Sequence, residues 1–233
     1  MTHRVTAALG AMALVAAGCG GVASAGADPP QVTITSLTTT TTTPPSTTAA
    51  PTTATTAPTA AARVEATQAY GTVEVSGDPL PQAPSEGADP AVGSAIPSLS
   101  GHDFAGAPVA ITDDGRAKMI VFLAHWCPYC QNEMPLIQEW LATVPLPEGV
   151  DVYAVATLTR PDRDNFPPAP WFERNEWSAP VIVDDPFDSA AVAFGLAAVP
   201  YWVIAAPDGT LVVRGTGGVP GEVLSEIAAS IAP

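Results

Sequence analysis

Residues 126–130 have the sequence Trp126-Cys127-Pro128-Tyr129-Cys130, in which two residues separate a pair of cysteines. Residues 119–124, which precede this stretch, are uniformly apolar and predict a short buried strand. Residues 131–142, which follow it, carry apolar side chains at helical spacing and predict a helix with one buried face. The two cysteines therefore lie where a strand turns into a helix.

The start of this helix favours a reactive thiol at Cys127. Pro128 suits the first helical position, because the N–H that proline lacks would have no partner there. Cys127 then lies at the N-terminus, where unpaired N–H groups and the helix dipole favour an anion such as a thiolate. We expect Cys130, one turn further along, to be more shielded and close enough to form a disulfide with Cys127.

The residues around the cysteines resemble the active site of the thioredoxin superfamily. Glu133 and Pro135 extend the motif to C-x-x-C-x-x-E-x-P, which is similar to the TlpA/ResA-like branch of membrane-tethered extracytoplasmic thioredoxins. Further along, Val199-Pro200 resembles the cis-proline of the superfamily, and Asp208-Gly209 resembles its late hairpin turn. The resemblance covers residues 91–233.

The resemblance implies an α/β protein with a thioredoxin-like fold, in which a central mixed β-sheet has helices on both faces. The order of the expected elements agrees with this, since strands alternate with helices before a final hairpin. We expect short helices at residues 171–177 and 189–194, a hairpin formed by residues 201–205 and 210–214, and a C-terminal helix at residues 221–231.

The resemblance also implies roles for individual residues. Cys127 attacks or is attacked, and Cys130 resolves the mixed disulfide. Glu133 manages protons, because a carboxyl in an apolar pocket can act as a base near neutral pH. The alternative for Glu133 is a solvated helix residue. For the cysteines, the alternatives are half of a zinc site or a purely structural disulfide.

Three further residues are expected to bind the substrate. Trp126 shapes the docking face beside the cysteines, unless it is an ordinary core residue. A cis bond between Val199 and Pro200 would put Pro200 against the cysteine pair. It would also expose the Val199 backbone to pair with an extended substrate strand. The alternative is a trans proline that opens an ordinary strand.

Two neighbours of the motif carry weaker expectations. His125 could stabilise the Cys127 thiolate, since histidine titrates in the physiological range. We favour the alternative, a partly buried histidine bonded to the backbone. Tyr129, between the two cysteines, is expected to be exposed.

The N-terminus predicts an export signal at residues 1–19. Arg4 supplies a positive charge, and residues 5–17 form an uncharged apolar run that is too short to span a bilayer. The stretch Ala16-Ala17-Gly18-Cys19 resembles a bacterial lipobox with Cys19 as the lipidated residue, whereas Ala23-Ser24-Ala25 would suit ordinary signal peptidase. The expected location is the outer face of the cytoplasmic membrane as a lipoprotein, or the exterior after cleavage behind Ala25.

Residues 20–90 are expected to form a disordered Thr/Pro-rich linker before a domain at residues 91–233. Residues 29–62 contain no charged side chain, and 15 of the 27 residues in 33–59 are threonine. So few apolar side chains cannot offset the entropy lost on ordering. The segment either tethers the domain at a distance from the membrane or is a spacer of no particular length.

The charge of −15 argues against nucleic acid and anionic lipid surfaces as partners. We expect an enzyme, an extracytoplasmic thiol–disulfide oxidoreductase that acts on thiols or disulfides of exported proteins. We favour a reductase that is recycled by a membrane redox partner and held by a lipid anchor, with no cofactor and no metal. The alternatives are a disulfide-forming oxidant of exported proteins and a redox-inert binding or chaperone module.

Overall fold

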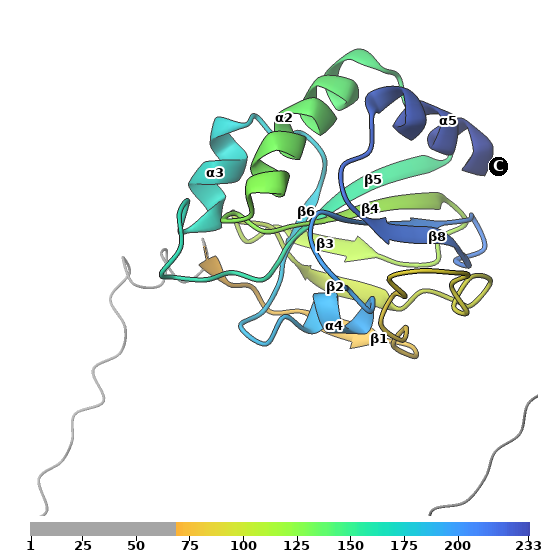
Figure 1. Cartoon of the computed structure of the whole chain (residues 1–233), viewed down its shortest axis with the longest axis horizontal. Helices are drawn as coiled ribbons and strands as arrows, with labels where there is room; N and C mark the ends of the chain where they lie inside the picture. The colour runs from red at the N-terminus through yellow and green to blue at the C-terminus, as the bar shows by residue number, and fades with distance from the viewer. Residues whose placement is uncertain (1–68) are drawn as a thin grey trace, which may run out of the picture. The chain divides into compact units, whose positions relative to one another are not determined.

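A mixed five-stranded sheet with the order β6-β5-β4-β7-β8 lies at the centre of the protein (Figure 1). The structure is a computed structural model, and it describes residues 69–233. The middle strand, β4, is parallel to β5 and antiparallel to β7, which makes the sheet mixed. Its strands are β4 (Ala117–Leu123), β5 (Val150–Ala156), β6 (Val181–Val183), β7 (Tyr201–Ala205) and β8 (Leu211–Thr216).

Both faces of this sheet are covered. Helices α2 (Pro128–Thr143), α3 (Pro168–Arg174) and α5 (Gly221–Ile231) pack on one face. The other face packs against helix α4 (Ser189–Ala193) and an antiparallel three-stranded sheet. The smaller sheet consists of β1 (Glu74–Ser76), β2 (Ser98–His102) and β3 (Pro108–Ile111).

Strand β4 illustrates why the sheet is buried on both sides. All seven of its residues are buried, and alternate side chains point to opposite faces. Met119, Val121 and Leu123 join the hydrophobic cluster under α2 and α5, whereas Ile120 and Phe122 join the cluster on the other face. The expected α/β architecture, with a mixed sheet covered on both faces, is therefore confirmed.

The folded part of the chain begins before residue 91, contrary to the expected boundary. Strand β1 pairs with β2, and Leu80 and Ala83 are buried. Their backbone N–H groups donate to the carbonyl oxygens of Ala193 and Gly195 at 2.8 and 2.9 Å. Residues 69–90 are rich in Pro, Gly and acids and have no periodic apolar pattern that would predict a helix or strand. Contacts with distant residues hold the segment in place.

Smaller differences concern element ends. Helix α3 begins three residues earlier than expected, at Pro168, because a proline again suits the first helical turn. Helix α2 continues through Pro135 to Thr143, and the C-terminal helix has the expected bounds. Within residues 69–233, no helix combines the length and apolar character needed to cross a bilayer. The predicted signal, Cys19 and most of the predicted linker lie outside the described residues.

Candidate active site

Cys127 lies directly between β4 and α2, as the N-cap residue of the helix, with Pro128 at the first helical position. The Sγ atom of Cys127 donates to the carbonyl oxygen of Val199 at 3.5 Å. Only 5% of the residue surface is exposed, and its thiol is free. Strand β4 and the start of α2 thus bring Cys127 against the segment that precedes β7.

Cys130 lies deeper in the protein. It is 0% exposed and has a free thiol, whose Sγ atom accepts the Ala124 N–H at 3.5 Å. Burial raises the pKa of the Cys130 thiol well above its usual range, and the nearby Cys127 and Glu133 act in the same direction. Cys130 therefore holds its proton strongly, and a base is needed to remove it near neutral pH.

Glu133 is buried rather than solvated, which contradicts the alternative of a solvated helix residue. It is 8% exposed, and its Oε1 atom accepts the backbone N–H of Val219 at 2.6 Å. Gly218 lies so close that a Cβ there would come within 3.0 Å of the Glu133 Cδ. The carboxyl therefore connects α2 to the segment between β8 and α5, and it lies near Cys130.

The peptide bond between Val199 and Pro200 is cis, as the resemblance implied. The Val199 carbonyl oxygen faces the Cys127 thiol, and the Pro200 carbonyl oxygen accepts the Gly217 N–H at 2.8 Å. The alternative of a trans proline is thus wrong, and Val199-Pro200 lies beside the cysteines.

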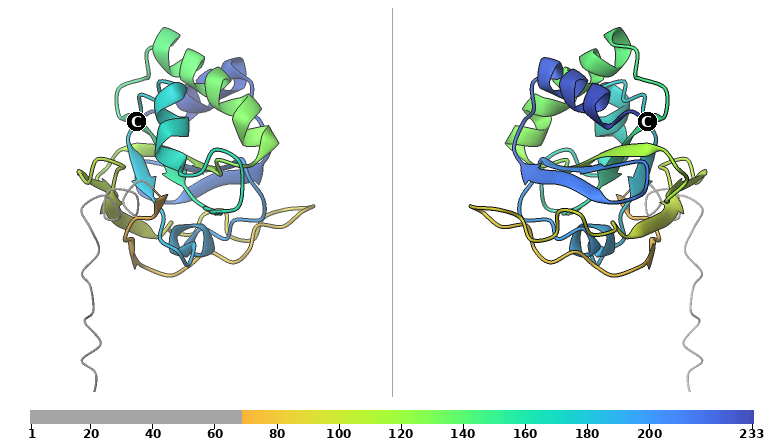
Figure 2. Two further views of the ribbon diagram at one scale, coloured as in Figure 1. Left: turned by 90° about the vertical axis from the view of Figure 1, so that its left-hand side faces the viewer. Right: turned by 90° about the vertical axis from the view of Figure 1, so that its right-hand side faces the viewer.

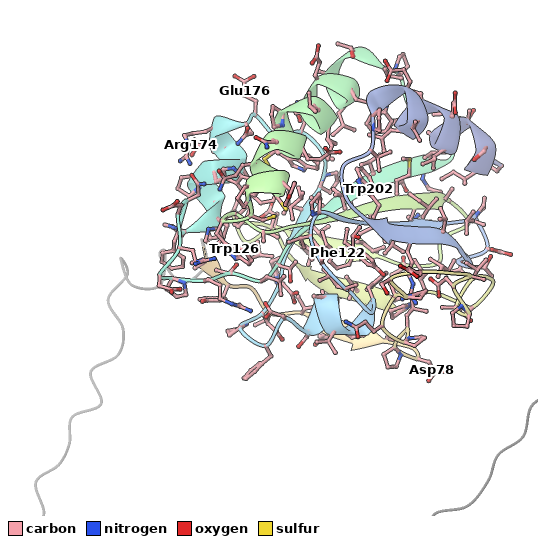
Figure 3. All side chains as sticks on the ribbon, viewed as in Figure 1. Asp78, Phe122, Trp126, Arg174, Glu176 and Trp202 are labelled. Atoms are coloured by element: carbon pink, nitrogen blue, oxygen red, sulfur yellow. The ribbon has the colours of Figure 1, made fainter. Side chains whose placement is uncertain are left out.

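Trp126 is partly buried and connects the cysteine motif to the loop at residues 157–167. Its indole N–H donates to the Leu158 carbonyl oxygen at 2.7 Å. The guanidinium of Arg163 lies over the Trp126 ring at 5.1 Å from the centroid. Figure 3 shows Trp126 below α3, at the edge of the molecule where this loop runs.

His125 binds the backbone of the same loop, in agreement with the alternative we favoured. Its ring is 1% exposed, and Nδ1–H donates to the Asp164 carbonyl oxygen at 2.6 Å. Its Nε2 atom accepts the Arg160 N–H at 3.2 Å, so the ring is neutral with the proton on Nδ1. Burial lowers the pKa of His125, which keeps the ring in this form.

The contacts of His125 and Trp126 with the loop at residues 157–167, here called the clasp, were not predicted from the sequence. Gln131 and Asn165 complete it, since their side-chain amides both donate to the His125 carbonyl oxygen at 3.1 Å. Loop residues 158–165 are mostly polar or charged and show no periodic pattern. The position of His125, two residues before Cys127, was the single sequence signal for this contact.

Tyr129 is 74% exposed, as expected. Residues 69–233 contain no group of three or more His, Cys, Asp or Glu side chains that could hold a metal ion. The site thus combines two free thiols, a buried carboxyl, a cis-proline and a clasped loop.

Comparisons with known proteins agree with this fold. The sequence model of a protein family described as "AhpC/TSA family" matches residues 92–214 of this chain. A DsbF homologue from Corynebacterium diphtheriae has a TM-score of 0.51 at 20% identity, over 64% of this chain and 98% of that chain. The thioredoxin domain of a thiol-disulfide oxidoreductase from Bacteroides vulgatus has a TM-score of 0.49 at 20% identity, over 61% and 99%.

A secreted disulfide oxidoreductase from Mycobacterium tuberculosis has a TM-score of 0.47 at 20% identity, over 56% of this chain and 94% of that chain. No curated protein matches the sequence. Likeness at such low identity shows the fold alone, whereas the family model matches more than half of the sequence. The chain therefore belongs to the AhpC/TSA family and is an oxidoreductase of the thioredoxin type.

Proposed function

We propose that this protein is an extracytoplasmic thiol–disulfide oxidoreductase that exchanges disulfides with exported proteins through Cys127 and Cys130. The observation that carries the proposal is the contact between the Cys127 thiol and the Val199 carbonyl oxygen at 3.5 Å. A client strand that pairs with the Val199 backbone would bring its own disulfide to this thiol. Trp126 and Pro200 would form the walls of the same docking face.

The reaction has two exchange steps. In the first, the Cys127 thiolate attacks one sulfur of a client disulfide, and the other client sulfur leaves as a thiolate and takes up a proton. In the second, Cys130 loses its proton and attacks Cys127 in the mixed disulfide. This step releases the second client thiol and leaves a disulfide between Cys127 and Cys130, so one disulfide is reduced and one is formed.

Glu133 is the group that we assign to the proton of Cys130. The Cys130 thiol has a raised pKa because it is buried, so it needs a base at the second step. The Glu133 carboxyl lies one helical turn away, and the Val219 N–H orients it. In the reverse direction the same carboxyl would return the proton to Cys130.

We favour a reductase of the TlpA/ResA type, recycled by a membrane redox partner. It would be held at the outer face of the membrane through lipidated Cys19, with residues 20–68 as the tether. The disulfide-forming oxidant is the alternative direction. A reduction potential of about −270 mV, as in thioredoxin, would support the reductase, and one of about −120 mV, as in a strong thiol oxidant, would support the oxidant.

Two experiments test the rest of the proposal. Insulin reduction by the full chain should depend on Cys127 and disappear in Cys127→Ser, whereas a redox-inert module would show no activity in the first place. For the location, Cys19→Ser should release the protein from the membrane fraction or block its processing. A mature soluble form that begins at Gly26 would overturn the lipid anchor.

A further inference from the structure

A groove of about 900 Å³ lies between the β2–β3 hairpin, helix α3 and the segment that leads into β6. The left view of Figure 2 shows α3 between this hairpin and the start of α2, which follows Cys127. The groove and the cysteine motif thus lie on opposite sides of one short helix. No step of the proposed exchange reaction uses this groove.

Three aromatic side chains line the groove. The Phe104 and Phe172 rings are 5.2 Å apart, and the Phe172 and Trp177 rings are 6.0 Å apart at a steep angle. The indole N–H of Trp177 is buried, and it has no hydrogen-bond acceptor in the part of the chain that the structure describes. The N–H itself is covered, so a ligand would contact the aromatic surface and not this group. Grooves with aromatic linings bind extended peptides.

The polar lining of the groove is acidic. Asp103, Glu173 and Glu176 line it, and no Lys or Arg does so. Glu173 and Glu176 are exposed, and neither forms an ion pair within residues 69–233. The intervening Arg174 donates to Asn165 at 2.8 Å instead, and Figure 3 shows Glu176 pointing outward beyond the end of α3. The groove therefore has uncompensated negative charge beside an aromatic surface.

Charge decides between the possible occupants. A second copy of this chain would also carry a charge of −15, so it would be repelled. The chain's own residues 29–62 contain no charged side chain and would leave the carboxylates unpaired. We infer that the groove binds an extended, basic segment of the client protein, with arginine or lysine beside proline or apolar residues. This inference rests on the proposed function, because it specifies which exported proteins the enzyme selects.

The chemistry of arginine fits this site on two counts. A guanidinium forms paired hydrogen bonds with carboxylates such as Glu173 and Glu176. It also stacks on aromatic rings such as Trp177. A client that is held in the groove presents its disulfide to Cys127 at a high effective concentration. The acidic surface also speeds the encounter with cationic clients.

Binding can be measured without any redox chemistry. The full chain carrying Cys127→Ser is titrated with a short cysteine-free peptide rich in arginine and proline, and with its uncharged citrulline counterpart. We expect the arginine peptide to bind more tightly and to shift the Trp177 indole N–H resonance. Replacing Glu173 and Glu176 together with glutamine should weaken binding about fivefold, as expected for the loss of two exposed ion pairs.

The matched control removes the same charge elsewhere. Glu222 and Glu226 are exposed on α5, on the opposite side of the molecule from α3 in Figure 1. Their replacement with glutamine should leave the peptide affinity within about a factor of two. Equal weakening by both double variants would mean that net charge alone attracts the peptide, and equal binding of the citrulline peptide would also overturn the inference.

The result of the peptide titration can be distinguished from the result of the test for thiol–disulfide exchange. If the exchange activity proved absent, the titration of the Cys127→Ser protein would still test the groove, because peptide binding does not require the cysteines. If the activity is present, a disulfide-bonded client with a basic segment should show a raised KM with the Glu173 and Glu176 variant at similar kcat. An unchanged KM would contradict a role of the groove in client selection.

Discussion

Replacing Asp89 with asparagine removes the counter-ion of a buried guanidinium. The Arg214 side chain is 0% exposed, and its Nε and Nη2 atoms donate to the two Asp89 carboxylate oxygens at 2.6 and 3.1 Å. The third nitrogen, Nη1, donates to the Phe194 carbonyl oxygen at 3.0 Å. Asparagine keeps one acceptor oxygen but carries no charge, so Arg214 would lose its ion-pair partner.

The size of the effect follows from this burial. Removing one partner of a buried ion pair costs about 3–5 kcal/mol, because the remaining charge is uncompensated. Asp89 is 12% exposed and asparagine still accepts one hydrogen bond, so we expect the lower end of the range. A loss of about 3 kcal/mol should lower the Tm by about 6–12 °C in a folded unit of this size.

The loss of unfolding free energy in Asp89→Asn should also depend on pH. The hydrogen bond from Arg214 holds the pKa of Asp89 below its ordinary value of 3.8. A carboxylate with a lowered native pKa stabilises the fold above its ordinary pKa, and this contribution is lost as the pH falls through the native value. The difference in unfolding free energy between wild type and Asp89→Asn should therefore be constant near neutral pH and shrink in strong acid.

Urea unfolding of the full chain at neutral pH, followed by circular dichroism, measures the free-energy difference. Asp78→Asn is the matched control, because Asp78 is exposed on the same segment and the replacement removes the same charge. A loss below about 1 kcal/mol for Asp89→Asn, or an equal loss for Asp78→Asn, would refute the claim that this ion pair anchors residues 69–90 to β8.

Three further predictions concern the site. Glu133→Gln keeps an oxygen for the Val219 N–H but removes the charge, so the pH profile of thiol reactivity should shift; an unchanged profile would argue against a role in proton transfer. Alkylation under native reducing conditions should modify Cys127 before Cys130, and Cys130→Ser should trap mixed disulfides with clients while Cys127→Ser traps few; equal trapping by the two variants, or alkylation of Cys130 first, would contradict the argument that the helix start makes Cys127 the nucleophile. His125→Phe removes both ring hydrogen bonds to the 157–167 loop, which should lower the stability by about 2 kcal/mol and increase proteolysis of this loop. Burial lowers the pKa of His125, so the unfolded chain takes up the proton at a higher pH than the folded protein, and the fold loses stability as the pH falls. Wild type should therefore approach the behaviour of the variant in acid. Equal proteolysis of both proteins at neutral pH would count against the clasp.

The sequence alone predicted the elements whose signals are local. The apolar run before Cys127 and the proline after it predicted a buried strand followed by a helix that begins at Pro128. Apolar residues at helical spacing likewise predicted the bounds of α5, Gly221–Ile231. These signals are readable because each depends on neighbours within one or two turns of the chain.

Only the tertiary structure decided how distant segments meet. The Asp89–Arg214 ion pair brings residues from the expected linker into the fold, although their composition is typical of a loop. Glu133 reaches the Val219 N–H, and His125 holds the loop of Arg160 and Asp164 by backbone groups. Every residue other than proline carries the same backbone N–H and C=O, so contacts of this kind leave no mark in the sequence. Their partners are fixed when the chain packs around the sheet.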